Sequence, residues 1–358
     1  MGKRKLPPRG SESGENIIHR FRAGERETLA KELKYASTDS FVRSMRETYG
    51  IRASELDIQV DNKEPERHPV VNLPSIKLLI PKVVKHKGDE EIAILHASDG
   101  HADKITKSFN KEIYRKRMEQ MFRSAMTIIN LHRNMYPINK LVIFNTGDNI
   151  QGENPHQGST VGEVSMGARD QVKKLAAPMW NDVLGSFKQH FNEVEFHGVP
   201  GNHGHDKLSP ETSSYDLFLY DILEAGIGQH DGINIHVHED WWAIVELFGF
   251  LHFLFHGDGI PCQQGVPFFA LDRKLKSWHM QYGGFRYAWS GHFHKAHYNE
   301  VSSVLGHFMC ASLASDDEWA LKKLGISSEP SQGLYGLHPI HGITWRYKLD
   351  VEPKRGNE

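Results

Sequence analysis

IAILHASDGH, at residues 92–101, contains the pattern that decides the fold: a short apolar run followed closely by polar residues that can bind a metal ion. The pattern recurs four times, as LVIFNTGDN at 141–149, EVEFHGVPGNH at 193–203, LFHGD at 254–258 and YAWSGHFH at 287–294. Short apolar runs bounded by glycine are typical of buried strands. We therefore expect five strands that each deliver Asp, Asn or His side chains from the carboxyl end.

Helical patterns separate these runs. A long amphipathic helix is expected at about 107–134, and shorter helices at about 179–187 and 215–224. Strands that alternate with helices indicate an α/β body, and open α/β sheets bind ligands at the carboxyl ends of their strands. The five polar groups should therefore meet in one crevice. Further strands are expected at 76–84, as the first arm of a hairpin that ends in Asp99, and at 233–238, 242–247, 251–255 and 342–351.

The N-terminal region differs from this body. Residues 1–14 are expected to be a disordered tail, 15–60 a helical domain, 61–75 a polar linker and 76–358 the α/β domain. Residues 1–52 carry 12 Lys and Arg against 7 Asp and Glu, a net charge of +5, which leaves −7 for the remainder. Two short helices joined by a tight turn in a basic segment resemble a helix-turn-helix. This predicts nucleic-acid contacts from Lys34, Arg43 and Arg46; the alternative is a helical appendage that packs on the body or on a partner.

Composition excludes other classes of protein. The 358 residues are 39% hydrophobic and 25% charged, as in globular proteins, and no apolar stretch approaches the length that spans a bilayer. No membrane association is expected. The basic N-terminus lacks the apolar stretch of a secretory signal, and two cysteines make no disulfide framework, so a cytoplasmic location is expected.

Histidine is unusually frequent, with 23 residues, of which only three precede residue 90. Any one of the five motifs alone would be an ordinary turn, because Asp or His beside Gly is common in loops. Together they supply the carboxylate, imidazole and amide groups that divalent ions accept. The set therefore favours a metal site over isolated turn residues.

In this order, the five motifs resemble the D-x-H, GD, GNH, H and GHxH series of the calcineurin-like metallophosphoesterases, over about residues 76–300. The resemblance implies a four-layer αββα sandwich of mixed sheets with a small helical N-terminal domain. It also implies two divalent ions, with Mn favoured and Fe or Zn as alternatives, and a metal-bound water or hydroxide that attacks phosphorus. One ion would take Asp99, His101, Asp148 and His294, and the other Asp148, Asn202, His256 and His292.

His203 would then donate a proton to the leaving oxygen or stabilise charge. The family motif usually continues with Asp or Glu, whereas position 204 is Gly. Asp206 could replace that carboxylate, or His203 could act without one. A second departure concerns the substrate: Asn149 is followed by Ile-Gln-Gly rather than the Asp-Arg-Gly of related protein phosphatases, which disfavours that branch.

The first motif resembles that of the exonuclease-like group, which includes double-strand-break repair nucleases. With the helix-turn-helix-like segment, this favours a DNA nuclease or DNA-associated phosphoesterase, of the kind that bacteriophages carry, acting in the host-cell cytoplasm. Asn149, His205 and His297 are expected to lie near the substrate phosphate. The alternatives are a phosphomonoesterase or small-nucleotide diesterase with an N-terminal assembly module, and a catalytically silent DNA-binding protein. Protein partners or a homo-oligomer remain open.

Overall fold

The computed structural model describes residues 6–51, 90–153, 163–205, 210–261, 267–315 and 329–352. The chain divides into two compact units, Met1–Pro81 and Lys82–Glu358, which we describe separately. The expected strand at 76–84 and the linker at 61–75 lie outside the described residues. In the described part of the chain, none of the helices combines the length and apolar character needed to cross a bilayer.

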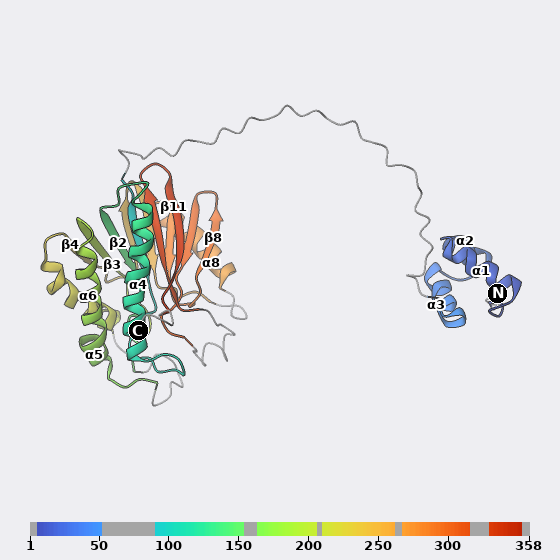
Figure 1. The fold of residues 1–358 in the computed structure, drawn as a ribbon, viewed down its shortest axis with the longest axis horizontal. Helices are drawn as coiled ribbons and strands as arrows, with labels where there is room; N and C mark the ends of the chain where they lie inside the picture. The colour runs from blue at the N-terminus through green and yellow to red at the C-terminus, as the bar shows by residue number, and fades with distance from the viewer. Residues whose placement is uncertain are drawn as a thin grey trace, which may run out of the picture. The chain divides into compact units, whose positions relative to one another are not determined.

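The first unit contains three helices, α1 (Glu12–Arg22), α2 (Arg26–Glu32) and α3 (Thr38–Tyr49) (Figure 1). A separate apolar core holds them together, and Phe21, Phe41 and Met45 are almost fully buried in it. The turn between α2 and α3 spans residues 33–37 and ends at Ser37, which forms a capping box with Ser40.

The expectation of a disordered tail over residues 1–14 is wrong from residue 6 onward. Helix α1 already begins at Glu12, because the Ser11 side chain accepts the Gly14 N–H at 3.1 Å. The preceding residues are held by long-range hydrogen bonds: Tyr49 donates its hydroxyl to the Pro7 carbonyl at 2.6 Å, and Arg9 donates to the Tyr49 carbonyl at 2.9 Å. A contact with a residue about 40 positions away leaves no local pattern in the sequence.

The second unit contains two sheets. The first has six strands in the order β11-β10-β1-β2-β3-β4 and the second has five in the order β5-β6-β7-β9-β8. The strands are β1 (Ile92–Ala97), β2 (Lys140–Asn145), β3 (Glu193–Gly198), β4 (Ile233–Val237), β5 (Trp242–Leu247), β6 (Phe250–Phe255), β7 (Tyr287–Ser290), β8 (His297–Ser302), β9 (Leu305–Met309), β10 (Ser331–His338) and β11 (Gly342–Asp350). The helices are α4 (Lys111–His132), α5 (Ala168–Gln171), a π-helix (Val172–Ala176), α6 (Ala177–Lys188), α7 (Tyr215–Ala225) and α8 (Phe268–Gln281), with 3-10 turns at Glu211–Ser213 and Ile227–Gln229.

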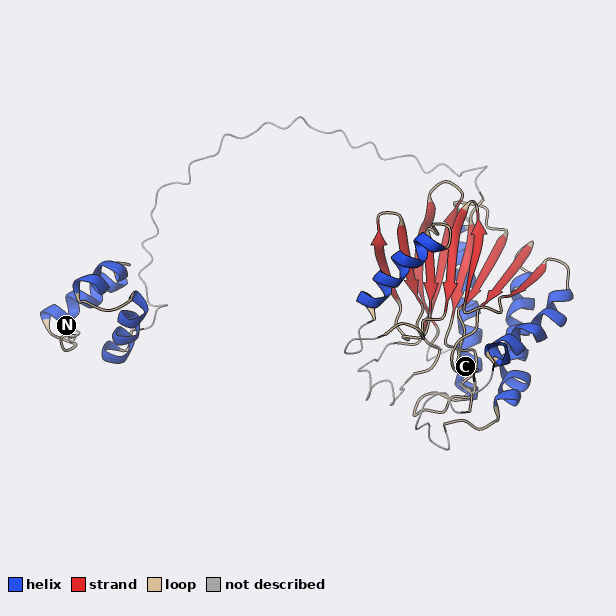
Figure 2. Cartoon of the chain, turned by 180° about the vertical axis from the view of Figure 1, so that it is seen from behind, coloured by secondary structure: helices blue, strands red, loops and turns tan. Residues whose placement is uncertain are grey.

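Three apolar clusters define four layers. The largest packs α4, α6 and α7 against one face of the six-stranded sheet. A second fills the space between the two sheets, and a third lies between the five-stranded sheet and α8. Figure 2 shows the strands between helices on either side. The expected α/β class and the four-layer αββα sandwich of mixed sheets are confirmed.

Strand register brings the motifs together. β1, β2 and β3 are parallel neighbours, with Ala97 opposite Asn145 and Asn145 opposite Gly198. The loops that carry DGH, GDN and GNH therefore leave the first sheet in one row. β6 and β7 are also parallel, so the loops after them, with His256 and with GHFH, leave the second sheet side by side.

Candidate metal centre

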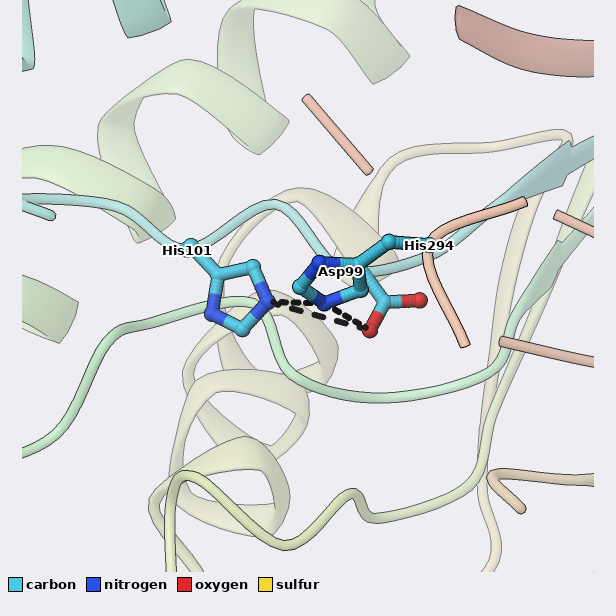
Figure 3. Close-up of side chains that lie close together, drawn as sticks. All are labelled: Asp99, His101 and His294. Carbon is cyan, nitrogen blue, oxygen red and sulfur yellow. Dashed lines mark hydrogen bonds and ion pairs between the residues drawn. The ribbon is translucent and has the colours of Figure 1, made fainter. Parts of the chain in front are cut away.

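One cluster of potential ligands combines the first and last motifs. His101 Nε2 and His294 Nε2 lie 3.0 Å apart, and Asp99 Oδ1 lies 3.3 Å from the His294 nitrogen and 3.7 Å from that of His101 (Figure 3). Asp99 and His101 are fully buried, and His294 is partly exposed. Residues 193 positions apart in the sequence thus converge on one point.

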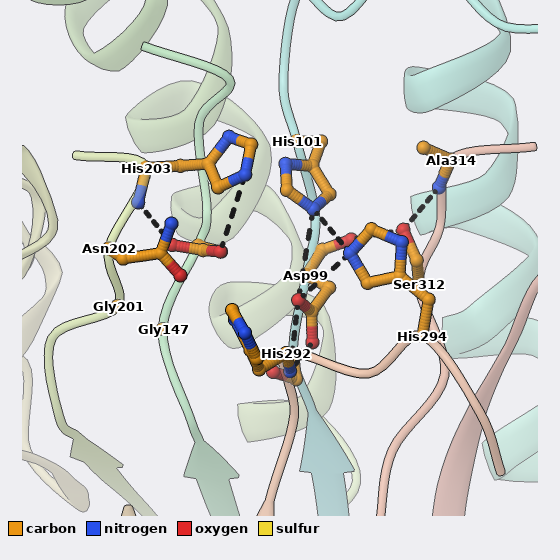
Figure 4. A network of polar contacts seen from close by, with 12 residues as sticks. Asp99, His101, Gly147, Gly201, Asn202, His203, His292, His294, Ser312 and Ala314 are labelled. Atoms are coloured by element: carbon orange, nitrogen blue, oxygen red, sulfur yellow. Dashed lines mark hydrogen bonds and ion pairs between the residues drawn. The ribbon is translucent and has the colours of Figure 1, made fainter. Parts of the chain in front are cut away.

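A second cluster combines the other motifs. His256 Nε2 lies 3.0 Å from Asp148 Oδ2, 3.1 Å from Asn202 Oδ1 and 3.2 Å from His292 Nδ1. Asp148 also approaches the first cluster, since ligand atoms of Asp148, His101 and His203 all lie within 4.8 Å of one another. All seven sequence-predicted ligands are therefore brought together, and Asp148 belongs to one group with His101 and to another with His256, as a bridging carboxylate would. Figure 4 shows Asp99, His101, Asn202, His292 and His294 gathered in one region.

The spacing of these donor atoms fits bound ions. With a metal–nitrogen bond of about 2.1 Å, two ligands at right angles around one ion lie about 3.0 Å apart, and two at the tetrahedral angle about 3.4 Å apart. The observed separations run from 3.0 to 3.7 Å in the first cluster and from 3.0 to 3.2 Å around His256 in the second. Imidazole, carboxylate and amide oxygen are also donors that Mn, Fe and Zn accept. The residues thus fit two divalent ions without selecting among the metals.

Backbone strain concentrates at the ligands. Asp99, His101, Asp148, His292 and His294 all adopt positive φ, between 46° and 67°. Non-glycine residues rarely occupy this left-handed region, and they do so mainly where function requires it. Such strain persists only where surrounding contacts impose it.

At Asp99 those contacts are visible. The Asp99 carbonyl accepts the Leu313 N–H at 3.0 Å and the Ser312 hydroxyl at 2.9 Å, and the His292 N–H donates to the Asp99 carboxylate at 3.0 Å. One residue earlier in the chain, the Ser98 N–H donates to Gln332 Oε1 at 2.8 Å. The segment before β10 and the start of that strand therefore hold the first ligand loop in place.

Burial controls the charges at the centre. Burial raises the pKa of Asp148 to about 6, although His256 beside it acts in the opposite direction. Burial lowers the pKa of His101 to about 3 and thereby favours the neutral imidazole that a metal requires. For Asp99, burial opposes ionisation, but hydrogen bonds from His101 and His294 outweigh it and hold the pKa well below the usual value. Nearby positive charge would stabilise a carboxylate as poorly solvated as that of Asp148.

Asp216 is a residue that the sequence did not single out. Its fully buried carboxylate accepts the main-chain N–H groups of Asp148, Asn149 and Gly201, at 3.0, 3.0 and 2.9 Å. It thereby joins the GDN loop to the GNH loop. A Cβ at position 201 would lie 2.2 Å from Asp148 Oδ1, so only glycine permits this approach. Asp216 lies in the first turn of α7 after the N-cap Ser214, which in the sequence resembles an ordinary helix start.

The expectation that Asn149 binds substrate is wrong. Its side chain is buried, and Nδ2 donates to Asn145, Asp216 and Tyr220 at 2.9 to 3.0 Å. Its Oδ1 accepts from Asn145 and from Trp180 Nε1. Because these partners use both ends of the amide, Asn149 holds the bridging loop against α6 and α7 and has no group left for a phosphate.

His203 reaches the centre, and its Nδ1 contacts a main-chain carbonyl. Its ring lies 4.4 Å from that of His101, and its Nε2 lies 3.9 Å from Asp148 Oδ2. Its Nδ1 lies 3.0 Å from the main-chain carbonyl of Gln151. Asp206 lies outside the described residues.

The other expected contact residues have local roles. His205 Nε2 lies 3.1 Å from the Pro210 carbonyl, and the ring of His297 packs on Phe268 with centroids 4.4 Å apart. Each of these two histidines therefore has a local partner, and a contact of His205 or His297 with the substrate phosphate stays a prediction. In the N-terminal unit, Lys34 lies in the turn between α2 and α3, and Arg43 and Arg46 lie on α3; all three are exposed.

Comparisons with known proteins found similarity only to solved structures. No protein-family model matches the chain, and no curated protein does. Among solved structures, the chain is similar to zinc-complexed Vps29 from Entamoeba histolytica at 13% identity, covering 73% of this chain and 99% of that one, with a TM-score of 0.32. A dimetal phosphatase from Danio rerio shows 11% identity over 73% and 99% of the two chains (TM-score 0.34), and a 5'-nucleotidase from Candida albicans 11% over 74% and 52% (TM-score 0.34).

Proposed function

We propose that this chain is a dinuclear-metal-dependent phosphoesterase of the calcineurin-like type that hydrolyses phosphodiesters, with DNA as the favoured substrate. One observation carries the proposal. Seven donor residues from five strand-end loops converge in two groups that Asp148 connects, at separations suited to bound ions. When bound, two divalent ions supply Lewis acidity and lower the pKa of a coordinated water toward neutrality.

The residues of the chain supply the rest of the reaction. A water oxygen forms the new bond to phosphorus while the bond to the leaving oxygen breaks, and the water proton passes to solvent. His203, whose Nε2 faces the centre, donates its proton to the leaving oxygen and recovers one from solvent. Asp99 and Asp148 offset the positive charge of the ions, and their buried loops exclude bulk water.

The favoured substrate follows from the N-terminal unit. A compact three-helix unit exposes Arg43 and Arg46 three residues apart, on one face of α3, with Lys34 in the preceding turn. Residues 1–52 carry a net charge of +5, and the remainder of the chain carries −7. This division supports binding of a polyanion by the smaller unit and hydrolysis by the larger. With the first motif, this favours the exonuclease-like branch and a phage-type protein. A cytoplasmic location is part of the same proposal.

The test is degradation of end-labelled single- and double-stranded DNA by the Mn-loaded protein, beside the Asp148→Asn variant. Cleavage by the wild type alone supports a nuclease. Hydrolysis of a small aryl phosphate ester without DNA cleavage would instead support a phosphomonoesterase or small-nucleotide diesterase. A protein that elemental analysis shows cannot be loaded with metal, yet binds DNA, would be the catalytically silent alternative and would overturn the proposal.

A further inference from the structure

The hydrogen bond from His203 to Gln151 depends on a short segment of chain that is itself firmly held. Gln151 is buried, and its N–H donates to the Ala102 carbonyl at 3.1 Å, which fixes it to the DGH loop. The next residue, Gly152, has a φ of 73°, and a Cβ there would lie 2.1 Å from the His203 carbonyl oxygen. The segment and the GNH loop are therefore in direct contact, and only glycine fits between them.

Gln171 holds this segment from the other side. It is fully buried at the end of α5, directly before the π-helix, and lies 19 residues along the chain from Gly152. Its Oε1 accepts the Gly152 N–H at 2.9 Å, and its Nε2 donates to the Gly152 carbonyl at 3.2 Å and to the Met166 carbonyl at 2.9 Å. One amide thus binds both polar groups of Gly152, as a neighbouring strand would.

The consequence for His203 is chemical. A carbonyl can only accept a hydrogen bond, so the Gln151 contact requires the proton of the neutral imidazole to lie on Nδ1. Nε2, which is directed toward the metal-ligand cluster, then carries no proton in the neutral ring. A displaced Gln151 carbonyl would free the ring to adopt the other tautomer, in which Nε2 cannot accept a proton.

We infer that Gln171 is the positioning residue of His203, acting through Gly152 and the Gln151 carbonyl. The inference rests on the proposed function only in assigning proton donation to His203. The tautomer itself is a property of the folded chain and can be measured without turnover.

The first test is NMR of the full-length protein labelled with 15N-histidine, with the His203 signals assigned from the His203→Ala variant. We expect the Nδ1–H tautomer in the wild type and a mixture in Gln171→Ala and in Gly152→Ala. Leu175→Ala removes a buried side chain of the same helical segment without touching Gly152, and Gly249→Ala places a Cβ at a φ of 80° with no atom within 4 Å. These two controls should keep the wild-type tautomer. An unchanged tautomer in folded Gln171→Ala and Gly152→Ala would overturn the inference.

The second test uses aryl phosphodiesters that range from p-nitrophenyl to unsubstituted phenyl leaving groups. Loss of a proton donor slows hydrolysis most for esters with poor leaving groups. The loss of kcat in Gln171→Ala should therefore be about 10- to 100-fold greater on the phenyl ester than on the nitrophenyl ester, a size typical of removing the outer partner of a functional histidine. Adding Gln171→Ala to His203→Ala should cost nothing further, and Gln171→Glu, which keeps the acceptor for the Gly152 N–H, should restore part of the loss. An equal loss on all esters would contradict the inference. If the wild type hydrolyses none of them, the proposed function fails, and the tautomer measurement still decides the role of Gln171.

Discussion

The carboxylate of Asp216 accepts the main-chain N–H of Asp148 at 3.0 Å, and both residues are buried, 68 positions apart in the sequence. The same carboxylate binds Asn149 and Gly201 and so sets the distance between two ligand loops. In these contacts it reaches main-chain N–H groups and not the side chain of a predicted metal ligand. Its role is to hold the bridging ligand in a left-handed backbone conformation.

Replacing Asp216 with Asn should therefore weaken both folding and metal binding. The asparagine amide directs N–H groups at main-chain donors, and each buried donor left without an acceptor costs about 1–3 kcal/mol. We expect a lower free energy of unfolding in urea and loss of at least one bound ion per chain by elemental analysis. Asp182→Asn, at an exposed position on α6, is the matched control and should change neither. Wild-type metal content in Asp216→Asn would contradict this role.

Asp148→Asn should abolish hydrolysis while the fold remains intact. The amide keeps the size of the carboxylate but removes the charge that both ion positions share, so the metal content should fall below two per chain. Circular dichroism should match the wild type, and the unfolding transitions should match when both proteins are metal-free, because bound ions stabilise the folded state. Retained hydrolysis would show that Asp148 is not the bridging ligand.

The protein should lose stability in mild acid through histidines that lie outside the metal centre. Burial lowers the pKa of His96, His252 and His307 to about 3 each. The unfolded chain takes up these protons near pH 6.5, so the stability is fully present above that pH and is lost as the pH falls toward 3. Each histidine contributes a slope of about 1.4 kcal/mol per pH unit within this window.

Urea unfolding of the metal-free protein between pH 7 and pH 4 measures this slope. His307→Gln keeps a hydrogen-bonding group for Ser290, which lies 2.9 Å from His307 Nε2, but cannot titrate. In the variant, the slope of the free energy of unfolding against pH should be smaller by the contribution of one histidine, about 1.4 kcal/mol per pH unit. A free energy of unfolding that stays constant from pH 6.5 to pH 4 would refute the assignment.

Deletion of residues 1–52 should weaken DNA binding in a salt-dependent way and spare turnover of a small aryl diester. The double variant Arg43→Ala/Arg46→Ala should reproduce part of this loss and reduce the slope of log affinity against log salt by about 2, since each phosphate contact contributes about 0.9. Arg123→Ala removes an exposed charge from α4 in the body and is the control. Equal DNA affinity with and without the N-terminal residues would exclude a DNA-binding role for the three helices.

The strand-end motifs, and the donor residues that they contain, could be identified from the sequence alone. Each ligand follows an apolar run and stands beside or near glycine, and parallel strands can only deliver such loops to one edge of a sheet. The α/β class needed no knowledge of side-chain packing, because the alternation of strands and helices is a local property. The assignment of individual ligands came instead from the resemblance of the five motifs, in their order, to a known series. The order of residues 7–9 could not be predicted because it depends on contacts with Tyr49, far along the chain, whereas the Ser11 cap that begins α1 at Glu12 is a local signal that the expectation of a disordered tail overlooked.

The contacts of the polar residues near the ligands depend on packing between distant parts of the chain. Asn149 stands next to a ligand, yet it turns inward to Trp180 and Tyr220, and Asp216 reaches the ligand loops from a helix start. Gln171 acts on Gly152 from 19 residues away. A buried polar group must find a hydrogen-bond partner, and which partner it finds depends on how separate elements pack rather than on adjacent sequence.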